Sequence, residues 1–214
     1  MTHISTEPTR RALHAVAELV LAGPQHRSSG HIRLTVTPTG FRTFAGPDVR
    51  VDGTDLVTAG QRVPIDGRTC AELAAAAGVR AGDPDGLYHD GSGASADQVL
   101  SLDTAAAEWL ERCWAAGADA LTRLDPQQEP ILWPEHFDVG IESAGVGYGV
   151  SPGDKFFDEP YAYVNPGTAH EDGGFWNAPF GAARPMRDLD GGTVEVVLAF
   201  FLEGRGRAGT GPAA

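Results

Sequence analysis

A heptad near the middle of the chain carries the residue types that do chemistry. It reads Leu132-Trp133-Pro134-Glu135-His136-Phe137-Asp138. His136 and Asp138 are separated by one residue, so on a strand both side chains would point to the same face. An imidazole beside carboxylates can transfer protons or bind a metal ion. A functional site, if the chain has one, is therefore predicted at this heptad.

Two metal-dependent chemistries fit the heptad. His136 and Asp138, with His170 as a third ligand, have the composition of a non-haem iron facial triad of the oxygenase type. A hydrolase would instead gather His89 and Asp90 with the heptad pair around a divalent metal that activates water. A His-x-Asp pair also arises easily by chance, so the metal-dependent enzyme is an alternative hypothesis.

The segment that follows the heptad alternates between apolar residues and glycine. Period-two alternation is typical of strands, so residues 136–151 are predicted to form a β-hairpin. The apolar face sets the predicted register. It pairs Ile141 with Val146, Val139 with Tyr148, and Phe137 with Val150.

The opposite face of this hairpin is predicted to be a groove. His136, Asp138 and Glu142 project from one strand, and the other strand presents Gly145, Gly147 and Gly149. Glycine within a strand often marks the close approach of a ligand or of another backbone. A small-molecule site on this face is the preferred hypothesis, with Trp176 and Asn177 as further ligand-binding candidates. The competing interpretation is a polar face that is solvated or covered by a helix.

Composition excludes some classes of partner. The chain of 214 residues has 16 basic and 29 acidic residues, a net charge of −13, which argues against binding nucleic acid or an anionic membrane. No stretch reaches the ~20 apolar residues of a membrane span, and no signal peptide is apparent. We expect an acidic cytoplasmic protein from a GC-rich bacterial genome. Its cofactors and oligomeric state are left undetermined.

The elements that would position the heptad are predicted from periodicity and capping signals. Helices are expected over 7–21, ended by Gly23-Pro24, and over 69–77, opened by a capping box. A longer helix from Asp103 or Thr104 to about 124 carries a buried stripe that includes Trp109, Leu110, Cys113 and Leu121. Residues 193–203 suit a helix or a strand, and a helix is predicted.

Short extended segments with turn residues between them occupy most of the remaining chain. Adjacent strands joined by short turns favour antiparallel pairing. The prediction is a single α+β domain over 1–205, with a mainly antiparallel sheet covered by helices. Two structural halves, 1–80 and 101–205, would be joined by a long loop at 81–100. Residues 206–214 are predicted to be a disordered tail.

Several motifs resemble those of a known family. They are the heptad, Tyr148-Gly149-Val150-Ser151-Pro152-Gly153-Asp154, Glu159-Pro160-Tyr161-Ala162-Tyr163-Val164 and Phe175-Trp176-Asn177-Ala178-Pro179-Phe180-Gly181. The chain is similar here to a family of uncharacterised, mainly actinobacterial proteins that has no assigned activity. The resemblance implies no substrate, cofactor or catalytic residue.

Other catalytic and nucleotide-binding motifs lack the context they need. Gly149-Val150-Ser151-Pro152-Gly153 has the spacing of Gly-x-Ser-x-Gly, but Ser151 precedes proline in a predicted turn and not at the strand-to-helix turn of a nucleophile elbow. Residues 145–150 lack the third glycine of the dinucleotide fingerprint and lead into a turn instead of a helix. Three classes therefore remain, which are a small-molecule-binding protein, a metal-dependent enzyme, and a structural or partner-binding protein.

Overall fold

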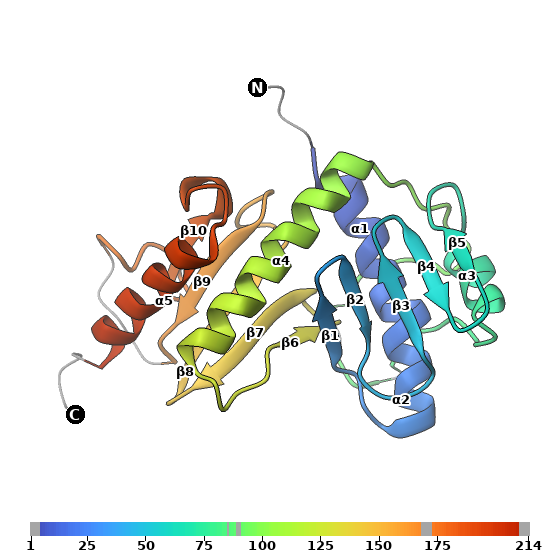
Figure 1. Ribbon diagram of the computed structural model, residues 1–214, viewed down its shortest axis with the longest axis horizontal. Coiled ribbons are helices and arrows are strands. Elements are labelled where there is room, and N and C mark those ends of the chain that lie inside the picture. Colours follow the sequence, from blue (N-terminus) through green and yellow to red (C-terminus); the bar gives the residue numbers. More distant parts are fainter. Residues whose placement is uncertain (1–4, 85, 89–90, 168–172, 210–214) are drawn as a thin grey trace.

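One antiparallel sheet organises the whole molecule. The structure is a computed structural model, which describes residues 5–84, 86–88, 91–167 and 173–209. Its ten strands follow the order β10-β9-β8-β7-β6-β1-β2-β3-β4-β5, and helices pack on the apolar side of this twisted sheet (Figure 1). The predicted α+β class, with a mainly antiparallel sheet covered by helices, is confirmed.

The N-terminal half consists of a long helix, five strands and a short helix. The long helix is α1 (Glu7–Val16), a π-helical segment (Ala17–Ala22) and α2 (Gly23–Ser29). The strands are β1 (Leu34–Thr37), β2 (Gly40–Thr43), β3 (Val49–Asp52), β4 (Asp55–Thr58) and β5 (Arg62–Pro64). The short helix α3 (Cys70–Ala76) begins with the predicted capping box between Thr69 and Glu72.

The C-terminal half repeats this order of elements. Helix α4 (Thr104–Leu124) precedes β6 (Ile131–Trp133), β7 (Asp138–Ser143), β8 (Val146–Ser151), β9 (Tyr161–Asn165) and β10 (Ala182–Pro185). A single 3₁₀ turn (Met186–Asp188) then leads to α5 (Val194–Ala208). Each half is therefore a helix, a five-stranded meander and a second helix, and the two meanders join at one residue pair, Leu34 with Leu132.

The first helix does not end at Gly23-Pro24 as predicted. It continues to Ser29 through the π-helical segment, where the Gly23 N–H donates to Glu18 O. Pro24 has no N–H, so the Leu19 carbonyl is left without a helical donor and accepts from the Gly82 N–H at 3.0 Å. The beginning of the long connection thus supplies a hydrogen bond to the carbonyl that proline left without a donor, and sequence periodicity does not reveal this contact.

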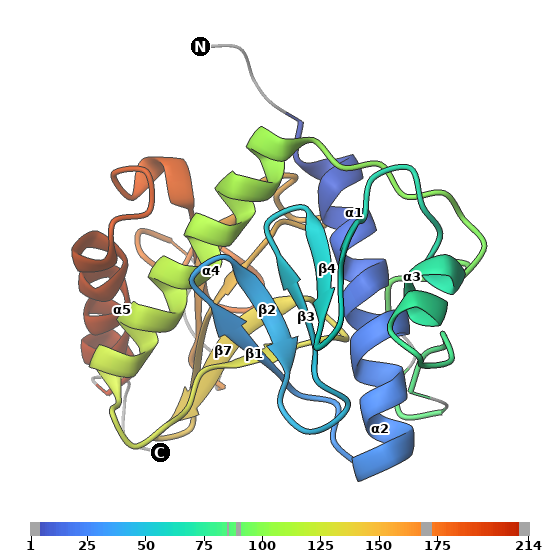
Figure 2. The same ribbon diagram turned by 45° about the vertical axis from the view of Figure 1, so that its right-hand side comes forward.

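Helix α4 crosses the sheet where the two halves meet (Figure 2). Asp103 caps its N-terminus by accepting from the Ala106 N–H. The prediction of a buried stripe is confirmed for Leu110, Cys113 and Leu121, but Trp109 is only half-buried. Trp114 is the buried indole, and its ring packs edge-on against Phe41 of β2 and Phe137 of the β6–β7 turn. This one side chain therefore bridges the two halves.

The C-terminal region is helical beyond the predicted boundary. The prediction of a helix at 193–203 is confirmed, and α5 continues to Ala208. Residues 206–208 are therefore helical, although they were predicted to belong to a disordered tail. An ion pair from Arg207 to Glu203, one turn earlier, supports this last turn. Residues 210–214 lie outside the described residues.

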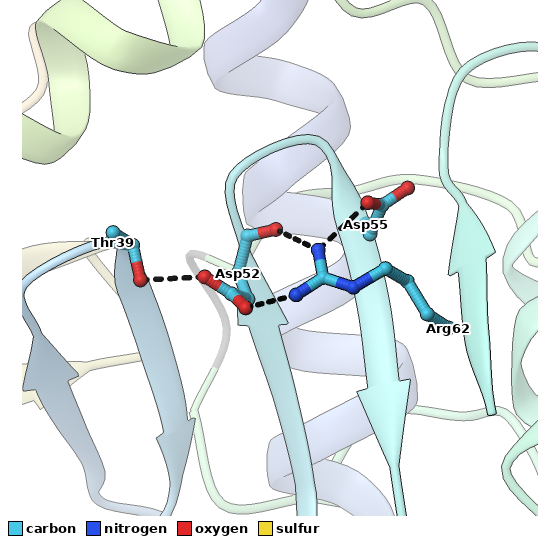
Figure 3. A network of polar contacts seen from close by, with 4 residues as sticks. All are labelled: Thr39, Asp52, Asp55 and Arg62. Carbon is cyan, nitrogen blue, oxygen red and sulfur yellow. Dashed lines mark hydrogen bonds and ion pairs between the residues drawn. The ribbon is translucent and has the colours of Figure 1, made fainter. Parts of the chain in front are cut away.

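The side of the N-terminal meander that faces away from the helices carries a network of exposed charges. Arg62 of β5 binds both Asp52 and Asp55, which flank the tight β3–β4 turn (Figure 3). Thr39 donates to Asp52 at 2.6 Å, and this hydrogen bond, with Arg62, lowers the pKa of that carboxyl. Each charged side chain in this network therefore has a partner of opposite charge.

Within the described residues no helix has the length and apolar character that crossing a membrane would require. The described parts of 81–100 contain no helix, and Val99 makes an isolated bridge to Thr69. Both cysteines are free and buried, and burial raises the pKa of the Cys70 thiol to about 12, so this thiol is not a nucleophile at neutral pH.

Candidate functional site

A cavity of about 660 Å³ lies at the end of the C-terminal meander. Its walls come from α1, the β6–β7 turn, the first residue of β7, the β8–β9 loop and β9, together with Ser92 of the long connection. Two of the predicted site residues, His136 and Asp138, line it. This size is within the range of small-molecule sites.

The hairpin beside the cavity forms with a different register from the predicted one. Ser143 pairs with Val146, so the loop is the two residues Ala144 and Gly145, both with positive φ. The turn demands this conformation, and the register consequently shifts by two residues, placing Val139 opposite Val150. A shift of two keeps each side chain on its predicted face. Gly145, however, lies in the turn and is not part of the predicted groove.

The glycine face is covered by a tyrosine of the same sheet. A Cβ added at Gly149 would lie 2.5 Å from the Tyr163 hydroxyl, and one at Gly140 would lie 3.1 Å from it. The two glycines therefore allow the Tyr163 side chain to lie across β8 and β7. Gly147 has only ordinary contacts, with Asn165. The predicted close approach is present, but a protein side chain makes it.

Asp138 accepts a hydrogen bond from Tyr163, whose side chain lies over the glycines of β7 and β8. Tyr163 donates a short hydrogen bond to Asp138 Oδ2, while Oδ1 is buried without a partner. The carboxyl is 8% exposed. Burial raises its pKa, whereas the Tyr163 hydrogen bond and nearby His136 act in the opposite direction. Burial and the Asp138 charge also raise the pKa of Tyr163, so the phenol remains the donor.

His136 lies in the β6–β7 turn and not on a strand, which corrects its predicted placement. The turn closes through the Phe137 N–H to Trp133 O, and Phe137 has a φ of 58°. Such a conformation is unusual for an aromatic residue and marks a constrained backbone. Phe137 is buried, so it anchors the turn while His136 stays exposed at the cavity mouth.

Helix α1 supplies two residues that the sequence did not single out. The His14 ring stacks on Phe137 with centroids 5.0 Å apart, and its Nε2 bonds to Pro134 O at 2.7 Å. Burial lowers the pKa of His14. One turn earlier, Arg10 lines the cavity, and its Nη1 is buried with no hydrogen-bond partner among the described residues. Desolvation lowers the pKa of Arg10, against the attraction of Glu7 and Asp154.

The β8–β9 loop forms an ordered wall. Asp154 Oδ1 accepts from the Phe156 and Phe157 backbone N–H groups, and Oδ2 accepts from the Tyr161 hydroxyl at 2.7 Å. The ring of Phe180 stacks against Tyr161. Both oxygens of Asp154 are thus occupied, so this carboxylate shapes the loop and leaves an aromatic surface facing the cavity.

A buried carboxylate next to the cavity was also missed. Glu18, in the π-helical segment, is 4% exposed and accepts from the Ser92 N–H at 2.9 Å and from the Ser92 hydroxyl. Ser92 and Gly91 line the cavity. A glutamate within an apolar helical stripe was the available sequence signal, and π-helical segments often occur at functional sites.

The other predicted site residues lie away from the cavity. Glu142 is exposed near the far end of the hairpin. Asn177 uses its side-chain amide to pair with the backbone of Ala183 at 3.0 and 2.9 Å, which holds the 173–181 loop to β10. Trp176 packs edge-on against Phe175. None of these three residues lines the cavity.

The predicted metal ligands are brought together only in part. His136 and Asp138 line the same cavity, and the histidine influences the pKa of the carboxyl. His170, the third predicted ligand, lies outside the described residues, as do His89 and Asp90. Among the residues that the structure does describe, no group of three His, Cys, Asp or Glu side chains has the arrangement of a metal site.

Comparison with known proteins gives no match to a protein-family model, to a curated protein or to a solved structure.

Proposed function

We propose that the protein binds a small polar molecule in the cavity between α1 and the end of the C-terminal meander. One observation carries this proposal. Asp138 Oδ1 and Arg10 Nη1 are buried without hydrogen-bond partners among the described residues, and both side chains line the same cavity. Leaving such groups unpaired costs about 1–3 kcal/mol each, and more for charged groups. A polar ligand that pairs with them would offset this cost.

The proposed site replaces the glycine groove as the place of binding. Tyr163 occupies the space above Gly149 and Gly140. The ligand therefore lies beside Tyr163, against Asp138 and α1. The expectation of a cytoplasmic protein remains part of this proposal. So does the expectation of no nucleic-acid partner, which rests on the net charge of −13.

A metabolite screen by thermal unfolding, followed by calorimetry of each hit, tests the proposal. A ligand at 100 times its Kd stabilises the folded state by about 2.7 kcal/mol, which is readily seen as a rise in Tm. Asp138→Asn should weaken binding at least tenfold. Glu142→Gln, on the same strand but outside the cavity, is the matched control and should leave the affinity unchanged. Equal affinity in the parent and Asp138→Asn would contradict a site at this cavity.

The metal-dependent enzyme is the second candidate, because His136 and Asp138 share the cavity. The same thermal experiment with Fe(II), Mn(II) or Zn(II) addresses it. If a metal binds through this pair, it should raise the Tm of the parent and not that of His136→Ala. A rise that is equal in both proteins would place the metal elsewhere.

A further inference from the structure

The distribution of charge around the cavity narrows the chemical class of its ligand. Residues 1–80 carry nine basic and seven acidic residues, a balance of +2, and residues 81–214 carry seven and 22, a balance of −15. The cavity lies in the acidic half, yet α1 brings Arg10 and Arg11 into its wall. The only lysine of the chain, Lys155, lines it as well. The cavity lining therefore places the cations Arg10, Arg11 and Lys155 beside three carboxylates, those of Glu135, Asp138 and Asp154.

Arg10 Nη1 is buried without a hydrogen-bond partner among the described residues, although Glu7, Asp154 and Asp158 attract the guanidinium. Asp154 attracts it, but the oxygens of that carboxylate already accept from two backbone N–H groups and the Tyr161 hydroxyl. Gly153 contributes to the confined space, since a Cβ there would lie 2.6 Å from Arg10 Nη1. A guanidinium presents paired N–H donors that match a carboxylate in a bidentate arrangement. The missing partner of Arg10 is therefore an anion, and a carboxylate fits its geometry.

Asp138 requires a hydrogen-bond donor on the ligand, whereas Arg10 requires an anionic acceptor. Its Oδ2 is fixed by Tyr163, so only Oδ1 is left to bind a further group. An amine or a hydroxyl can donate to this oxygen, and a second carboxylate would be repelled. Between the two charged residues, Tyr161 and Phe180 present aromatic rings to the cavity. Such rings suit an apolar or aromatic middle portion.

We propose that the ligand is a small amino acid or hydroxy acid with an apolar or aromatic side chain. Its carboxylate pairs with Arg10, its amine or hydroxyl donates to Asp138, and its side chain lies against Tyr161 and Phe180. This inference rests on the proposed binding function and adds the identity of the ligand class. A phosphate monoester would share the anionic chemistry at Arg10, so it is tested separately.

Four probes that differ by single groups test the class by calorimetry on the full chain. L-phenylalanine and L-phenyllactate carry both groups, 3-phenylpropanoate lacks the amine or hydroxyl, and phenethylamine lacks the carboxylate. At least one of the first two should bind, and each deletion should weaken binding at least tenfold. Inorganic phosphate serves as the fifth probe. If phosphate binds through Arg10 and none of the carboxylates do, the ligand class is wrong.

Two variants assign each group to its residue. In Arg10→Met, removing the carboxylate from the probe should weaken binding less than threefold. In Asp138→Asn, removing the amine or hydroxyl from the probe should likewise weaken binding less than threefold. Arg112→Met, at an exposed position of α4 that does not line the cavity, is the control for Arg10. If Arg10→Met does not fold, Arg10→Lys keeps the charge without the bidentate fork and should still weaken carboxylate binding. Unchanged discrimination in a folded Arg10 variant overturns the inference.

The metabolite screen and the probe titrations together distinguish a wrong ligand class from a wrong binding function. If the metabolite screen finds a ligand that needs Asp138, while the amino-acid and hydroxy-acid probes do not bind, the ligand class is wrong and the binding function stands. If no compound binds at all, both proposals fail.

Discussion

The two halves of the molecule share one architecture but treat the exposed side of their meanders differently. In the N-terminal half, Arg62 binds Asp52 and Asp55 at the surface, and each charge has an opposite partner (Figure 3). In the C-terminal half, Asp138 is buried under Tyr163 with one oxygen unpaired, and Arg10 faces the same cavity without an ion pair among the described residues. In the first arrangement each charged side chain has an ion-pair partner. In the second, two buried polar atoms have no hydrogen-bond partner among the described residues.

This difference indicates where function is to be sought. Exposed ion pairs contribute about 0–1 kcal/mol and need no further explanation. Buried polar groups without partners are costly and uncommon, so each calls for an explanation, and at the cavity a bound ligand is the one that we propose. Glycines in β7 and β8 create the space for the buried cluster, and the N-terminal meander has no comparable run of glycine on adjacent strands.

Replacing Trp114 should have the largest effect, because this side chain joins the two halves. Trp114→Ala removes its contacts with Phe41 and Phe137, and we expect a loss of roughly 3–5 kcal/mol of unfolding free energy. Trp109→Ala is the matched control, since that indole is half-buried, and should lose less than half as much. Urea unfolding of both variants measures the difference. Equal losses would mean that the packing between the halves is not centred on Trp114.

The glycines of β8 provide the next test. Gly149→Ala places a Cβ 2.5 Å from the Tyr163 ring and 2.6 Å from Val139 O, and should destabilise the protein by about 1–3 kcal/mol through overpacking. In Gly147→Ala the nearest atom is 3.5 Å away, so the same substitution two residues earlier should cost less than about 0.5 kcal/mol. Thermal unfolding ranks the two. Reversed ranking would show that Tyr163 does not lie over Gly149.

Glu111 of α4 tests whether a buried carboxylate with an unpaired oxygen is costly outside the cavity as well. Its Oε1 lacks a partner among the described residues, and burial, with Asp52 and Glu108, raises its pKa to about 7. Because the folded protein holds this proton more tightly than the unfolded chain, unfolding free energy should fall as pH rises from about 4.5 to about 7.

The isosteric variant Glu111→Gln should remove that fall. It is expected to be more stable than the parent by roughly 1–2 kcal/mol at pH 8, allowing for partial screening by solvent, with no such advantage at pH 4. Urea unfolding at the two pH values gives the comparison, with Glu129→Gln, at an exposed position away from Glu111, as control. A parent protein whose stability does not change between them would contradict the assignment.

The surface network should show the smallest effect. Arg62→Met removes both ion pairs of the β3–β4 turn but keeps the aliphatic part of the side chain. We expect the smallest loss of unfolding free energy among these variants, and the loss should shrink in 1 M salt because these charges are exposed. A loss as large as that of Gly149→Ala would show that the network is structural in the same sense as the buried cluster, and the contrast between the halves would weaken.

Periodicity and capping carried most of the fold prediction. The stripe of α4, the capping box of α3, the antiparallel pairing and the parity of the 136–151 hairpin are local properties, and all appear in the structure. Boundaries that depend on distant partners were wrong. The helix continued through Gly23-Pro24 because Gly82 satisfied the Leu19 carbonyl, and β10 formed from Ala182–Pro185 because β9 offered an edge.

For the candidate site, the sequence by itself determined that His136 and Asp138 lie close together and that glycines flank Asp138 across the strand pair. Only the tertiary structure decided what fills the glycine face and what faces Asp138. Tyr163 comes from the next strand, and Arg10 and His14 come from a helix more than 120 residues earlier in the chain. No local pattern encodes such pairings, because they follow from the strand order and from how α1 packs beside the β6–β7 turn.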